Sequence, residues 1–160
     1  MLVPAVLYDW RYYRIPNRLI LSGYVLGMTA SCRGGTAGFT EFVLGALLPV
    51  IVLILVHRMG ILGGGDVKLL SVAGGFLGLE EGMKCVLYSF LFGAGISLLV
   101  LMQKRNFKTR ICYFLNYIRT VIHTGIWTPY YQTARDGYDN TIHFSAAILL
   151  AALLVIWESM

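Results

Sequence analysis

Long apolar runs separated by short basic connections most constrain how this 160-residue chain can fold. Five of these runs approach the ~20 helical residues needed to cross a hydrocarbon core. They are residues 19–30, 39–56, 67–79, 86–102 and 141–157. Residues 1–8 are also apolar, but eight helical residues reach only about 12 Å. The pattern predicts an all-α, polytopic membrane helix bundle of about six membrane helices, the first of them short.

The composition agrees with a membrane protein. Hydrophobic residues make up 58% of the chain, charged residues 13%, and the mean hydropathy is +0.71. Soluble domains carry about a quarter charged residues, and a chain of this length has too little interior to bury so many apolar side chains. We therefore expect residues 1–160 to form a single domain embedded in the lipid bilayer.

The basic residues predict the orientation of this bundle. Most of them fall on one side: Arg11, Arg14, Arg18, Arg58, Lys68, Lys104, Arg105, Lys108, Arg110, Arg119 and Arg135. Only Arg33 and Lys84 fall on the other side. The positive-inside rule places the basic side in the cytosol, and six crossings leave both termini on the outer face. The net charge of +5 is thus a topology signal, and we expect no nucleic-acid partner.

The long connection between residues 103 and 140 is predicted to contain an amphipathic helix. Its apolar residues recur at helical spacing: Ile111, Phe114, Leu115, Ile118, Val121 and Ile122. Polar residues such as Arg119 and His123 face away from them. The pattern is typical of a helix lying on the inner leaflet, and equally of one packed on the bundle.

The three cysteines form no CxxC pair, which excludes a zinc-ribbon module of the usual spacing. Cys32 and Cys85 fall on the same outer side, so the topology allows a disulfide between them. The simpler interpretation is that they are small apolar packing residues. We expect neither a metal nor a cofactor.

Two aspartates lie at the cytosolic ends of their segments. Asp9 follows the first apolar run and Asp66 precedes the run at residues 67–79, so their carboxylates can meet at one depth. Paired carboxylates do not easily ionise together and therefore share a proton. One can then act as a base on water while the other, protonated, donates to a substrate carbonyl. This chemistry hydrolyses a peptide without a metal.

Three glycines precede Asp66 in the stretch GILGGGDVKLL, residues 60–70. Glycine lowers helix stability by about 1 kcal/mol relative to alanine and lets another chain approach closely. A protease beside a membrane needs both properties, because its substrate must reach the carboxylates in extended form. Alone, a glycine run is more typical of helix packing or a turn, and a lone aspartate is more typical of a helix cap.

A second motif, DWRYYRIPN at residues 9–17, changes this balance. Pro16 breaks the helix and biases Ile15 towards extended backbone, while Asn17 can cap the next helix. D-x5-I-P-N followed by G-x-G-D-x-K, with apolar spans between them, resembles the type IV prepilin peptidase family of GxGD aspartyl proteases. The short, single-domain form resembles the peptidases of tight-adherence (Flp) pilus systems.

The resemblance implies which residues of this sequence form the site, because each matches a position of the family's motifs. Asp9 and Asp66 match the catalytic pair. The supporting positions are Gly63 and Gly65 of G-x-G-D, Ile15, Pro16 and Asn17 of the turn motif, and Lys68, a lysine common in the family. His143 stands where many members have proline, and we expect it to be structural.

The resemblance also implies a function. Such enzymes are aspartyl endopeptidases of the bacterial inner membrane that remove the basic leader of type IV prepilins or pilin-like proteins at the cytosolic face. The partner is the substrate's leader and hydrophobic helix, which we expect to pack on the small residues Gly74, Gly75 and Gly78. Large members also N-methylate the product through a region with paired CxxC motifs. We expect no methyltransferase domain here.

Other functions fit some of the same residues. Presenilin-like intramembrane proteases share the GxGD feature, although their Pro-Ala-Leu motif is not found here. A small ion- or proton-coupled transporter would use Asp9 and Asp66 as ion ligands. A membrane scaffold would keep the motif without catalysis. Processing of a coexpressed pilin identifies a peptidase, whereas ion flux in liposomes identifies a transporter.

Overall fold

The computed structural model describes residues 1–59, 62–103, 112, 116, 119–120 and 143–160. Within these residues the chain is helical and contains no strand. The elements are α1 (Leu2–Tyr12), α2 (Asn17–Ser31), the 3-10 helix η1 (Cys32–Gly34), α3 (Gly35–Arg58), α4 (Gly64–Leu77), α5 (Leu79–Gln103) and α8 (Phe144–Glu158). The predicted all-α class is confirmed, and each apolar run overlaps one of these α-helices.

Two helical stretches are long and apolar enough to cross a membrane. One is Asn17–Arg58, which takes in α2, η1 and α3, and the other is Leu79–Val100 within α5. Among the described helices, α8 is apolar but shorter, and α1 is short, as predicted. The described residues thus contain two spanning candidates, fewer than the six membrane helices predicted. The apolar residues of the predicted amphipathic helix lie outside the described residues.

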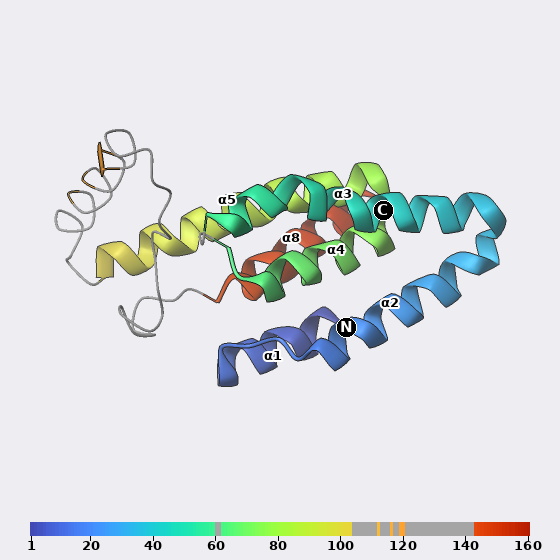
Figure 1. The fold of residues 1–160 in the computed structure, drawn as a ribbon, viewed down its shortest axis with the longest axis horizontal. Coiled ribbons are helices and arrows are strands. Elements are labelled where there is room, and N and C mark those ends of the chain that lie inside the picture. Colours follow the sequence, from blue (N-terminus) through green and yellow to red (C-terminus); the bar gives the residue numbers. More distant parts are fainter. Residues whose placement is uncertain (60–61, 104–111, 113–115, 117–118, 121–142) are drawn as a thin grey trace.

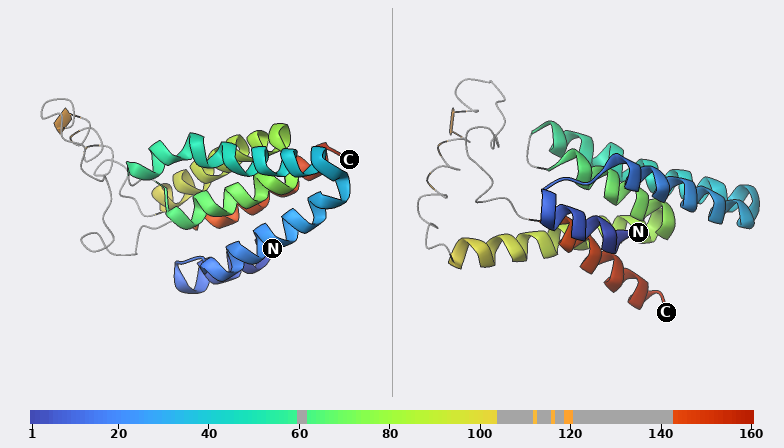
Figure 2. Two further views of the ribbon diagram at one scale, coloured as in Figure 1. Left: turned by 45° about the vertical axis from the view of Figure 1, so that its right-hand side comes forward. Right: turned by 90° about the horizontal axis from the view of Figure 1, so that it is seen from below.

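Successive helices run back and forth along the bundle (Figure 1). The C-terminal ends of α1, α3 and α5 and the N-terminal ends of α2, α4 and α8 therefore lie at one end. We call this the motif end, because it holds residues 9–17 and 63–68. The other end, the far end, holds η1 and the turn between α4 and α5. Figure 2 shows the same layout from two further directions.

The central helix is α4, which contacts α1, α2, α3, α5 and α8. Its buried residues are Val67, Leu69, Leu70, Ser71, Val72, Ala73, Gly74 and Gly75. Ser71 donates a hydrogen bond to the Ala46 carbonyl of α3, and the Tyr24 hydroxyl of α2 donates to Ser71. A buried hydroxyl without a partner is costly, so these bonds fix α4 relative to α2 and α3.

The glycines on α4 are used for packing within the bundle. A β-carbon at Gly74 would collide with the Gly45 carbonyl oxygen of α3, and one at Gly75 would collide with the Phe42 ring. Gly78 ends α4 with a φ of +84°, a conformation that favours glycine. α3 occupies the face formed by Gly74 and Gly75, so this part of the predicted docking face for a substrate helix is covered within the bundle.

The cysteines do not pair. Cys32 is exposed beside the turn between α2 and α3, whereas Cys85 is buried in α5, and both are free. The disulfide that the topology allowed is therefore absent. Cys85 belongs to the apolar core, which agrees with the simpler interpretation of this residue as a small packing group.

Candidate active site

Asp9 lies near the end of α1, and the turn that follows it is closely defined. Tyr13 adopts left-handed backbone (φ 52°), and its N–H donates to the Asp9 carbonyl oxygen at 2.9 Å. Pro16 then takes extended backbone and precedes α2, as its role as a helix breaker predicts. The predicted Asn17 cap is wrong. Pro16 occupies the cap position, and Asn17 is the first residue of α2.

The side chain of Asn17 instead connects the two motifs. Lys68 on α4 donates a hydrogen bond from Nζ to the Asn17 Oδ1 atom at 3.0 Å. Ile15 packs over Gly65, where a β-carbon would lie 3.5 Å from Ile15 Cβ. Both contacts join the turn between α1 and α2 to the first turns of α4. The two motifs therefore form one structural unit, and Lys68 has a structural role in it.

Asp66 lies in the first turn of α4, where the helix N-terminus favours negative charge. Gly63 precedes the helix with extended backbone (φ −66°, ψ 141°), while Gly64 and Gly65 are already helical. A β-carbon at Gly63 would lie 2.9 Å from the Asp66 Oδ2 atom. Glycine at this position therefore leaves room for the carboxyl group.

His57 covers the glycine run and was not among the predicted site residues. It lies in the last turn of α3, and its Nδ1 atom is 2.9 Å from the Leu62 carbonyl oxygen. A β-carbon at Gly64 would lie 3.2 Å from its Cε1 atom. The imidazole thus limits Gly64 to glycine unless the ring moves. A single histidine at a helix end carries no distinctive sequence signal.

The structure places Asp9 and Asp66 at the same end of the bundle, the motif end. Helices α1 and α4, which carry them, contact each other, and the Asp9 carboxylate is near enough to act electrostatically on the Asp66 carboxyl group. Both residues are partly buried. Within the described residues, no group of three or more His, Cys, Asp or Glu side chains could hold a metal ion. Two neighbouring carboxyl groups can transfer protons to and from water and a carbonyl group.

Two residues at the start of α8 complete the surroundings of Asp9. Ser145 is fully buried, and its Oγ atom donates to the Asp9 Oδ2 atom at 2.5 Å. The His143 Nδ1 atom lies 3.5 Å from the same oxygen, and the His143 ring packs on Tyr13 with centroids 4.7 Å apart. Ser145 was missed by the sequence reasoning, although it is a polar residue at the start of an otherwise apolar run.

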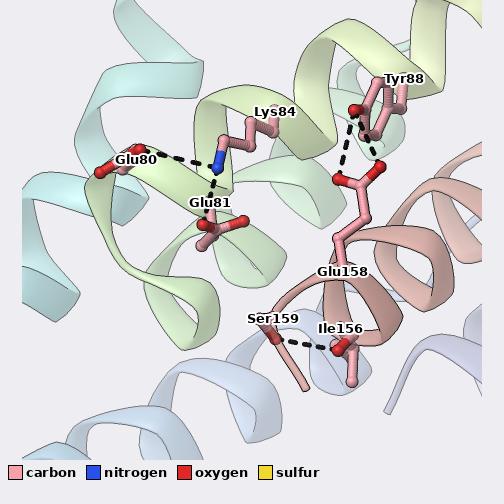
Figure 3. Close-up of polar contacts among 7 residues, drawn as sticks. All are labelled: Glu80, Glu81, Lys84, Tyr88, Ile156, Glu158 and Ser159. Carbon is pink, nitrogen blue, oxygen red and sulfur yellow. Dashed lines mark hydrogen bonds and ion pairs between the residues drawn. The ribbon is translucent and has the colours of Figure 1, made fainter.

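The far end of the bundle carries a different set of charges (Figure 3). Lys84 forms ion pairs with Glu81 at 2.9 Å and with Glu80 at 3.6 Å. The Tyr88 hydroxyl contacts both carboxylate oxygens of Glu158 at 3.2 Å. The motif end instead carries basic residues, namely Arg11, Arg14, Arg18, Arg58 and Lys68. The described charges therefore separate between the two ends as the sequence pattern predicted.

Comparison with known proteins agrees with this geometry. The model of the type IV leader peptidase family matches residues 1–98, whereas no curated protein and no solved structure matches the chain. The matched segment runs from α1 into α5 and includes Asp9 and Asp66, while His143 and Ser145 lie beyond it. Since the match covers more than half of the chain and contains both motifs that meet at the motif end, this protein belongs to the type IV leader peptidase family.

Proposed function

We propose that this protein is an aspartyl endopeptidase that removes the basic leader of type IV prepilins or pilin-like proteins. The observation that carries the proposal is that Asp9 and Asp66 lie at the same end of the bundle, on helices α1 and α4, which contact each other. These carboxyl groups come from two helices that are separated in sequence by α2 and α3. Family membership supplies the reaction class, and the carboxylate pair supplies chemistry that hydrolyses an amide.

The proposed reaction uses one proton shared by the two carboxyl groups. The ionised carboxylate takes a proton from water, and the water oxygen attacks the scissile carbonyl carbon. The protonated carboxyl group donates its proton to the carbonyl oxygen. When the tetrahedral intermediate collapses, the C–N bond breaks and the amine leaves with the proton taken from water. The hydroxyl proton of the intermediate returns to the pair, which regains its starting state.

The charge of the motif end supports a cytosolic position for the site. Basic residues of membrane proteins concentrate on the cytosolic side, and Arg11, Arg14, Arg18 and Arg58 lie at the same end as the carboxyl pair. We therefore place the site at the cytosolic face of a bacterial inner membrane, in a multi-pass protein. This charge would repel a basic leader. We assign recognition to the apolar helix that follows the leader in such substrates.

The test is coexpression with a candidate prepilin, followed by gel and mass analysis of the product. The native protein is expected to cleave the leader, and Asp9→Asn and Asp66→Asn are each expected to abolish cleavage. Glu80→Gln is the matched control, because Glu80 is 85% exposed at the far end. Cleavage that survives either aspartate change would remove the aspartyl mechanism. A native protein that processes no leader-bearing pilin would remove the substrate assignment.

A further inference from the structure

The two carboxyl groups of the pair have unequal surroundings. The Asp9 Oδ2 atom accepts a hydrogen bond from Ser145 and lies 3.5 Å from the His143 Nδ1 atom. Within the part of the chain that the structure describes, Asp66 accepts no hydrogen bond from a side chain; it faces the Gly63 backbone and the Asp9 charge. Since hydrogen-bond donors favour the ionised form of a carboxyl group, the two members of the pair differ in a way that bears on their roles.

The Ser145 hydroxyl indicates the protonation state of the Asp9 oxygen that it contacts. Ser145 is 0% exposed, so leaving its hydroxyl without a partner would be costly. Its bond to Asp9 requires an oxygen that accepts, which means that Oδ2 of Asp9 does not carry the shared proton. A hydrogen bond to a charged acceptor is stronger than one to a neutral acceptor. The buried serine therefore favours an ionised Asp9.

The position of His143 also favours an ionised Asp9. Its Nδ1 atom is buried and, among the described residues, makes no hydrogen bond of good geometry. The neighbouring polar atom is the Asp9 Oδ2 atom. An Nδ1 lone pair facing a carboxylate would be repelled, so the tautomer with a proton on Nδ1 is favoured. An Nδ1 proton would lie beside the Asp9 carboxylate, 3.5 Å from its Oδ2 atom at the nitrogen, and stacking on Tyr13 holds the ring in place.

We infer that Ser145 and His143 are positioning residues that hold Asp9 as the ionised member of the pair. Asp9 is then the base that activates water, and Asp66 carries the proton given to the substrate carbonyl. This inference deepens the proposed function and rests on it. Among the described residues, Tyr13, which stacks on His143, and Lys68, which bonds the Asn17 amide oxygen, are further titratable groups at the motif end.

The kinetic test compares two buried serines. Ser145→Ala removes the bond to Asp9, whereas Ser89→Ala removes a bond to the Cys85 carbonyl within α5 from an equally buried hydroxyl. We expect Ser145→Ala to lower kcat about 10- to 100-fold, the effect of losing one hydrogen bond to a charged group. KM should change less than about twofold, because the bond acts through Asp9 and not on substrate binding.

The pH profile separates this role from a merely structural one. Without its donors the Asp9 carboxylate is harder to keep ionised, so the acidic limb of the kcat profile should move to higher pH in Ser145→Ala. Ser145→Thr keeps a hydroxyl and should restore the native profile. His143→Phe keeps the ring on Tyr13 but loses Nδ1. It should move the limb in the same direction and lower kcat about 2- to 10-fold, since its contact is longer.

A second readout needs no peptidase activity. The chain has four aspartates, Asp9, Asp66, Asp136 and Asp139, so carbon-13 labelling of the aspartate carboxyl groups gives a simple NMR spectrum. Asp9→Asn and Asp66→Asn assign the two signals. At a pH at which the pair holds one proton, the Asp9 signal should be that of a carboxylate and the Asp66 signal that of a carboxylic acid. Ser145→Ala should reduce the difference.

The results of these experiments test the role of Asp9 separately from the proposed peptidase function. The reverse assignment of the two signals would overturn the inference, as would unchanged kcat, pH profile and spectrum in Ser145→Ala. If Ser145→Ala does not fold, His143→Phe carries the same test. A protein that cleaves no prepilin, but shows an ionised Asp9 that depends on Ser145, would contradict the proposed function and leave the assignment of Asp9 standing.

Discussion

Helices α4 and α1 each supply one carboxyl group, but they are held in the molecule in different ways. α4 is surrounded by five other helices, and eight of its 14 residues are buried. Ala5 is the one buried residue of α1, and Leu7 and Trp10 are 59% and 70% exposed. Packing of the core therefore fixes Asp66. Asp9 depends on a few polar contacts with α8, so the pair has one rigid member and one that a single side chain can disturb.

The largest effect is expected at the two carboxyl groups that α1 and α4 supply. Asp9→Asn and Asp66→Asn should each lower cleavage at least about 100-fold, since general acid–base catalysis contributes that much or more. The double variant should be no worse than either single variant, because residues that act as a unit are not additive. Cleavage rates of the three variants on one prepilin measure this. Losses that multiply in the double variant would mean that the residues act independently.

The well-packed helix α4 can be destabilised by a change in its packing against α3. Gly74→Ala places a β-carbon against the Gly45 carbonyl oxygen and should destabilise the bundle by about 1–3 kcal/mol, as overpacking of a core does. Unfolding in detergent gives the measurement. Gly95→Ala is the matched control, because nothing lies within 4 Å of a β-carbon there. A Gly74→Ala protein as stable as Gly95→Ala would show that α3 and α4 are not in close contact.

A change in the hydrogen bond that joins α4 to the turn after α1 should have a smaller effect on cleavage. Lys68→Met removes the hydrogen bond to Asn17 and loosens the turn after α1 from α4. Cleavage should fall roughly 2- to 10-fold, as expected for the loss of one hydrogen bond, here an exposed one, and Asn17→Ala should have the same effect. Lys84→Met serves as the control, since Lys84 pairs with glutamates at the far end. An equal loss in both lysine variants would indicate a general effect of charge.

Much of the fold could be predicted, because each apolar run is long enough to form a helix wherever it lies. The convergence of the two aspartates could also be predicted, since alternating helices bring residues 9–18 and 58–68 to one end. The partners of Asn17 and Asp9 could not. Lys68 and Ser145 are distant in sequence, and their types occur in many places. The inward packing of Gly74 depends on which helix covers it, which periodicity does not reveal.

The smallest effect is expected at the far end. Tyr88→Phe removes the contact with Glu158 on α8, but the contact is exposed, and exposed polar pairs contribute little to stability. Neither the unfolding temperature nor cleavage should change measurably. A clear loss of cleavage would show that the position of α8 at the far end controls the site at the motif end.

Cross-linking measures whether Asp9 and Asp66 lie close together at one end of the bundle. In a protein whose native cysteines are replaced by alanine, Asp9→Cys and Asp66→Cys are treated with a short bifunctional thiol reagent in membranes, and mass spectrometry identifies the joined peptides. We expect efficient joining of these two positions and none between Asp9→Cys and Glu81→Cys, which lies at the far end. Joining of Asp9→Cys to Glu81→Cys, with none to Asp66→Cys, would contradict the account.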